Sequence, residues 1–117
     1  MLKLEGKRVF LACGSTDMRK SINGLALIVE ESFGLDPFGG ALFVFCNRSR
    51  DRVKILEWDR DGYWLHLKRL EKGHFRWPSS GSESTMDLTG EELAYLLGGT
   101  SVELKLRRNE VFERKMA

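Results

Sequence analysis

The sequence predicts an α+β fold: an antiparallel β-meander with one amphipathic helix before it and one after it. Three observations support this prediction. Apolar residues recur with helical spacing over residues 18–33, basic and apolar residues alternate over residues 52–58, and turn-forming clusters separate the apolar runs between them. The chain has 117 residues, 42% of them hydrophobic, which suits one domain with a real core. We therefore expect a single domain over residues 1–106 and a charged, flexible tail over residues 107–117.

The first elements are a short strand and the firmer of the two helices. Val9–Cys13 is apolar and is followed by Gly14 and Ser15, which favours a strand that ends in a turn. Over residues 18–33 the apolar spacing predicts a helix that Gly34 terminates. Asp17 is the expected N-cap of this helix, with Thr16 and Ser21 as alternatives.

Three consecutive strands are expected in the middle of the chain, over Ala41–Cys46, Arg52–Trp58 and Tyr63–Lys68. The sequence Asp-Arg-Asp-Gly at residues 59–62 favours a hairpin loop between the second and third of them. Side chains alternate across a strand, so Val53 and Ile55 should face the core while Arg52 and Lys54 face solvent.

After these strands the signals become shorter. Residues 74–77 are expected to be a short extended piece stopped by Pro78, and the serine-rich residues 79–84 a flexible loop. Thr89 is followed three residues later by Glu92, which predicts a capping box and a helix running to Leu97. Residues 102–106 could add a last strand.

The composition also bounds the compartment and the chemistry. The longest apolar runs are far below the roughly 18 residues that a membrane span needs, and the charged N-terminus is unlike a signal peptide, so we expect a cytoplasmic protein. Cys13 and Cys46 lie in apolar segments and should be reduced, buried residues. Because Cys and His lack zinc-ligand spacing, we expect no metal and no cofactor.

Catalysis is not expected. The aspartates that could form a two-metal site are each placed where a cap or a turn would use them: Asp17, Asp36, Asp51, Asp59 and Asp61. The chain has no phosphate-binding loop, because the glycine at position 14 lacks the required second glycine and lysine. Serine, cysteine and histidine are too scattered to indicate a nucleophile with its base.

Positive charge is concentrated in the middle of the chain, although the formal net charge is only +2. Residues 48–76 carry nine basic side chains against five acidic ones, and eight of the aromatic residues lie within residues 38–77. Arginine is suited to phosphate or carboxylate, and an exposed tryptophan could stack on a base or anchor a protein partner. The candidate binding residues are Arg19, Lys20, Arg48, Arg50, Arg52, Lys54, Trp64, Lys68, Arg69, Arg76 and Trp77.

Several longer motifs resemble one protein family with order and spacing intact over about residues 8–98. They are Thr16–Leu25, Asp36–Phe45, Asp51–Gly62, Lys68–Gly73 and Phe75–Pro78. Together they resemble TnpB, the Orf2-like accessory proteins of the bacterial insertion-sequence family sixty-six. The resemblance implies a protein that works beside a separate, larger transposase, which would carry the catalytic carboxylates. Residues 100–117 match none of these motifs.

Two functions follow as hypotheses. The first is a non-catalytic accessory protein of transposition that binds nucleic acid through a basic hairpin face. The alternative is a protein adaptor that docks on the element's transposase without contacting DNA. The expected partners are the transposase and DNA, and a homo-oligomer is possible. Neither composition nor spacing ranks the two strongly.

Overall fold

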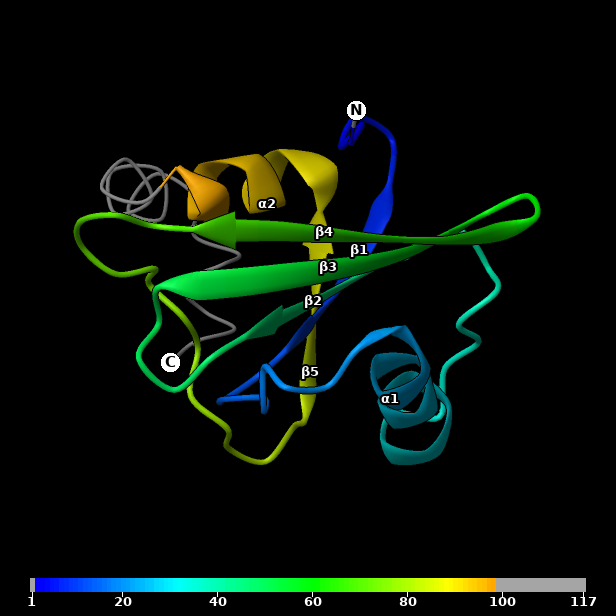
Figure 1. Cartoon of the computed structure of the whole chain (residues 1–117), viewed down its shortest axis with the longest axis horizontal. Coiled ribbons are helices and arrows are strands. Elements are labelled where there is room, and N and C mark those ends of the chain that lie inside the picture. Colours follow the sequence, from blue (N-terminus) through cyan, green and yellow to red (C-terminus); the bar gives the residue numbers. More distant parts are fainter. Residues whose placement is uncertain (1, 99–117) are drawn as a thin grey trace.

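The structure is a computed structural model in which residues 2–98 are described. Five strands and two helices make up this part of the chain (Figure 1). In chain order the elements are β1 (Arg8–Ala12), α1 (Ile22–Leu27) continued by the π-helical segment η1 (Ile28–Ser32), β2 (Leu42–Cys46), β3 (Arg52–Asp59), β4 (Gly62–Arg69), β5 (Thr85–Thr89) and α2 (Gly90–Leu97). The predicted α+β class is therefore confirmed for the described residues.

The strands form one mostly antiparallel sheet with the order β4-β3-β2-β1-β5. β2, β3 and β4 pair antiparallel with their chain neighbours, as the prediction of a meander requires. β1 instead lies parallel to β2, so the chain crosses over from β1 through α1 before it enters the sheet again. β5, which the sequence did not predict, pairs antiparallel with the other side of β1.

Both faces of the sheet are covered, because α1 and α2 lie on opposite sides of it (Figure 1). On the α1 face, Leu25 and Val29 pack with Phe43, Phe45 and other residues of the sheet. On the α2 face, a second and larger cluster joins the helix to the sheet and to the loop after β4. All five β2 residues are buried, as expected for a central strand covered on both sides.

The first helix starts later than the predicted residue 18. Residues 18–20 form a turn, Ser21 is the N-cap, and the regular helix begins at Ile22. Asp17 is thus not the helix cap. Its Oδ1 accepts a hydrogen bond from the backbone N–H of Arg19 at 2.9 Å, the local turn that aspartate commonly forms. The periodicity marked the apolar face correctly but could not separate a helix from the turn before it.

The segment before Pro78 and the capping box at Thr89 are the predicted features of the second half of the domain. Residues 74–77, predicted to be a short extended piece, belong to no strand, and their Phe75 and Trp77 are buried in the core of the α2 face. The capping box is present, since Thr89 accepts from the backbone of Glu92 while the Glu92 carboxylate accepts from the backbone of Thr89. α2 then ends at Leu97, where the sequence placed its end.

Two expectations fall on residues that the structure does not describe, namely the strand over residues 102–106 and the tail over residues 107–117. Within residues 2–98, no helix has the length and hydropathy needed to cross a membrane.

A candidate nucleic-acid interface

The open end of the β3–β4 hairpin places two arginines side by side. Arg52 and Arg69 are direct cross-strand partners, and both are exposed on the face that α1 covers elsewhere. Like charges directly opposite one another in a sheet are unfavourable. The pair therefore places two positive charges at neighbouring positions of the sheet.

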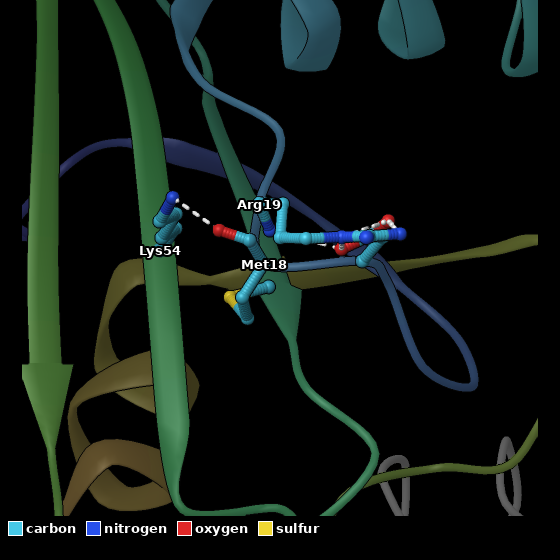
Figure 2. Close-up of polar contacts among 4 residues, drawn as sticks. Met18, Arg19 and Lys54 are labelled. Atoms are coloured by element: carbon cyan, nitrogen blue, oxygen red, sulfur yellow. Dashed lines mark hydrogen bonds and ion pairs between the residues drawn. The ribbon is translucent and has the colours of Figure 1, made fainter.

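The chain before α1 brings further positive charge to the same region, and Lys54 holds it there. Lys54 lies two residues after Arg52 on β3, and its Nζ donates to the backbone carbonyl of Met18 at 2.7 Å and of Lys20 at 2.9 Å. Figure 2 shows Lys54 pointing from its strand toward Met18, while the Arg19 side chain extends away from it. Lys54 is therefore half-buried and structural, which corrects the expectation that it faces solvent.

We call the exposed positive residues of this region the basic surface: Arg19, Lys20, Arg48, Arg52 and Arg69. Arg48 belongs to it through the β2–β3 turn, which leads directly into Arg52. Val53 and Ile55, which alternate with Arg52 and Lys54 along β3, are buried on the opposite face as predicted.

Two members of the basic surface carry their own acidic partner. Arg19 Nη2 lies 2.8 Å from Asp17 Oδ2, and this hydrogen-bonded pair lowers the pKa of Asp17 to about 2. Arg69 Nε lies 3.1 Å from Glu71 Oε2. Lys20, Arg48 and Arg52 form no ion pair with the rest of the described chain, so they offer the most available charge.

Arg50 and Trp77 are structural residues, which corrects their place among the candidates. Arg50 has a φ of 62°, and its Nη1 donates to the carbonyl of Trp77 at 2.7 Å. Trp77 is only 4% exposed and donates from Nε1 to the carbonyl of Ala12 at 2.8 Å. The two residues together fix the loop after β4 against β1, so neither is available as a binding platform.

The remaining candidates lie away from the basic surface. Trp64 and Lys68 are on the α2 face of β4, where the Lys68 Nζ donates to the carbonyl of Leu97 at 2.7 Å and thereby caps α2. Trp64 is 56% exposed, and its ring stacks on His66 with centroids 6.1 Å apart. Arg76 is exposed in the loop between two buried aromatic residues. The structure thus divides the candidates among two faces and a loop.

Sequence reasoning missed an exposed apolar side chain on the outermost strand. Leu67 is 63% exposed on the α1 face of β4, directly beside Lys54 in the cross-strand register. Leu65 and Leu67 recur with strand period in the predicted third strand, but no prediction was made of the face on which they lie. The exposed position follows only from the place of β4 at the edge of the sheet.

Asp36 and Asp51 occupy structural positions. Asp36 Oδ1 accepts from the backbone N–H of Phe38 at 2.9 Å, and Asp51 Oδ1 accepts from the Asn47 side chain at 2.7 Å. The Asn47 hydrogen bond lowers the pKa of Asp51, as expected for a stabilised carboxylate. Among residues 2–98, no three His, Cys, Asp or Glu side chains are grouped closely enough to hold a metal ion.

Comparison with known proteins identifies the family. The sequence model of one family, described as IS66 Orf2 like protein, matches residues 7–107. The chain belongs to the IS66 Orf2-like family. The match includes every strand and helix of the described fold and extends past its last described residue. The resemblance found in the sequence motifs is therefore confirmed.

Relatives of this IS66 Orf2-like protein occur in Sinorhizobium fredii (strain NBRC 101917 / NGR234). The uncharacterized protein y4hO is 42% identical over 92 residues, which are 79% of this chain and 79% of that protein. The uncharacterized protein y4jC is 33% identical over 94 residues, or 80% of each. No solved structure matches the chain.

Proposed function

We propose that this IS66 Orf2-like protein is a non-catalytic accessory protein of transposition that binds nucleic acid through the basic surface. Family membership supports the transposition role, and the structural positions of the aspartates are consistent with a protein that does no chemistry itself. The element's transposase is the expected partner in the reaction.

The observation that carries the binding proposal is the cross-strand pair of Arg52 and Arg69. Two guanidinium groups on adjacent strands repel each other in the free protein and attract a shared anion. The planar guanidinium group of arginine can donate two hydrogen bonds to the oxygens of one phosphate. The phosphodiester backbone of a nucleic acid can therefore bind both arginines at once.

The way in which Lys54 holds the preceding chain supports the same function. Its ammonium group lies between β3 and the turn that carries Arg19 and Lys20, and it fixes the position of that turn relative to Arg52. Positive charge from a loop and from a strand is therefore preorganised on one surface. Preorganisation reduces the entropy that binding would otherwise cost.

A protein adaptor without DNA contacts is the second candidate, and the exposed apolar side chains favour it. Trp64 and Leu67 are both more than half exposed on an edge strand, and tryptophan is enriched at the energetic centres of protein interfaces. In this alternative the transposase would contact β4, and the basic surface would meet acidic groups of the partner.

A charge-reversal experiment distinguishes the two functions. The variant Lys20→Glu/Arg52→Glu should keep the fold, weaken binding to double-stranded DNA, and make the slope of log K against log salt shallower by about 1.8, or about 0.9 for each lost phosphate contact. The matched control is Lys3→Glu/Arg60→Glu, which reverses two exposed charges outside the basic surface and changes net charge equally. It should leave the slope nearly unchanged.

The same variants can be tested for transposase binding in a pull-down. Equal weakening of DNA binding by both variants would show that only net charge matters and would overturn the proposed surface. Unchanged DNA affinity together with loss of transposase binding in Lys20→Glu/Arg52→Glu would establish the adaptor function instead.

A further inference from the structure

The outer edge of β4 has the features of a strand that is paired in the functional protein. β4 is an edge strand of eight residues, and no other strand within residues 2–98 covers its outer side. Its pairing with β3 is continuous from Gly62 to Arg69, without a bulge. Natural proteins protect such edges with proline, bulges, short strands or inward-pointing charges. β4 has none of these before Lys68, and exposes Trp64 and Leu67 instead.

The hairpin geometry identifies the backbone groups that point outward. A two-residue loop joins Asp59 to Gly62, and at the other end of the hairpin the backbone N–H of Leu70 donates to the carbonyl of Asp51 at 2.8 Å, so these two residues form a hydrogen-bonded pair. The residues that close such a loop are hydrogen-bonded to each other, and hydrogen-bonded pairs then alternate along the ladder. Consequently the backbone N–H and C=O groups of Tyr63, Leu65 and Leu67 point away from β3, toward the open edge.

The side chains of this edge are complementary to those of a second copy. If β4 runs antiparallel to another β4 with Leu65 opposite itself, Tyr63 lies opposite Leu67 of the other copy and Asp61 lies opposite its Arg69. Outward backbone groups then meet outward backbone groups, and apolar side chains meet on the α1 face. At both ends an acidic residue faces a basic one, in addition to the contact of Arg69 with Glu71 in its own chain.

We infer that two copies of this protein associate through antiparallel pairing of their β4 edges, centred on Leu65, to form one continuous sheet. The relation is a closed two-fold one, in which the same surface is used by both copies. Opposite residues in an antiparallel pair point to the same side, so a two-fold axis perpendicular to the sheet places both basic surfaces on one side of the dimer. The inference concerns assembly. It shares Arg69 with the basic surface, and its tests therefore measure mass and crosslinking rather than DNA binding.

The first test measures the mass of the protein in solution and asks whether dimerisation depends on the exposed edge of β4. The full chain should move with concentration from 13.4 kDa toward twice that mass in size-exclusion chromatography with light scattering. Leu67→Lys should shift the equilibrium to monomer because it places a lysine in the apolar contact. The matched control is Leu27→Lys, which changes a leucine that is 51% exposed on α1, outside the interface. The control should dimerise like the original protein.

Charge exchange provides a second variant set that does not depend on apolar contacts. Asp61→Arg should weaken the dimer at least tenfold, because it opposes two arginines at each end of the interface. The double variant Asp61→Arg/Arg69→Asp exchanges the two charges and should recover the dimer. A merely destabilising effect of Asp61→Arg would not be reversed by the second change.

Crosslinking tests the register. In a Cys13→Ser background, Leu65→Cys should form an intermolecular disulfide under mild oxidation, because residues opposite each other have Cα atoms about 5.5 Å apart. Leu67→Cys should not, because the two copies of residue 67 are four residues out of register. A monomer at all concentrations, larger open-ended assemblies, or a dimer unaffected by Leu67→Lys and Asp61→Arg would each overturn the inference.

Discussion

Lys54→Met tests whether the ammonium group of Lys54 holds the chain before α1 in place. The substitution keeps an unbranched apolar side chain but removes two hydrogen bonds from a charged donor to the carbonyls of Met18 and Lys20. Hydrogen bonds to charged groups contribute about 1.5–3 kcal/mol each. Because water can reach the freed carbonyls, we expect a total loss of about 2 kcal/mol in the free energy of unfolding.

Urea unfolding followed by tryptophan fluorescence measures this loss. For an m-value of about 2 kcal/mol/M, the midpoint should fall by about 1 M. Lys72→Met is the matched control, because Lys72 is exposed and forms no ion pair within the described chain, and its effect should stay within about 0.5 kcal/mol. If Lys54→Met changes the free energy of unfolding no more than Lys72→Met does, the lysine does not position the turn that carries Arg19 and Lys20.

Three further substitutions test other parts of the structure. Asp17→Asn should remove a contribution to stability that is present above the ordinary pKa of 3.8 and is lost as the pH falls toward the lowered pKa of about 2, which thermal unfolding between pH 5 and pH 2 would detect. Thr89→Ala should cost about 1 kcal/mol by removing the capping box of α2, measured by urea unfolding. Gly90→Ala should also destabilise the protein, despite the better helix propensity of alanine, because a Cβ at this position collides with the carbonyl oxygen of Leu4; an increased melting temperature would contradict this packing.

Local signals in the sequence predicted most of the elements. The Asp-Arg-Asp-Gly loop, the alternation along β3 and the capping box at Thr89 each involve residues within a few positions of one another, and each is present in the structure. Secondary structure that depends on short-range hydrogen bonds and on side-chain period can be inferred from such signals. The correctly predicted elements are those that depend on interactions between residues close together in the sequence.

The topology depends on contacts between distant residues, which the sequence did not reveal. β5 alternates over only five residues and pairs with β1, more than seventy residues earlier in the chain. The parallel arrangement of β1 and β2 likewise follows from α1 crossing one face, which no short motif encodes. The residues around Thr89 predicted the capping box, but they did not predict the strand β5 that ends at the same residue.

At the candidate site too, the sequence gives the residue types but not their positions in the tertiary structure. Arginines are concentrated in residues 48–76 of the sequence, but residue type alone did not distinguish the role of Arg50 from that of Arg52. Arg50 is used internally because the loop after β4 returns to it and presents the carbonyl of Trp77. Arg52 is exposed because it lies on the opposite side of the turn, opposite Arg69. Only the tertiary structure assigns one arginine to stability and the other to a surface.

The Arg52–Arg69 pair also bears on the proposed function. A neutral or acidic side chain in place of Arg52, opposite Arg69, would stabilise the hairpin. Glu71 neutralises only one of the two arginines, at 3.1 Å from Arg69, and leaves Arg52 without an ion pair in the described chain. The repulsion expected between the two arginines is reduced by Glu71 beside Arg69 and by the attraction between Arg52 and the neighbouring Asp51. This cross-strand pair is the reason for proposing the nucleic-acid interface at the open end of the β3–β4 hairpin, because Arg50, Lys54 and Lys68 instead donate to backbone carbonyls within the protein.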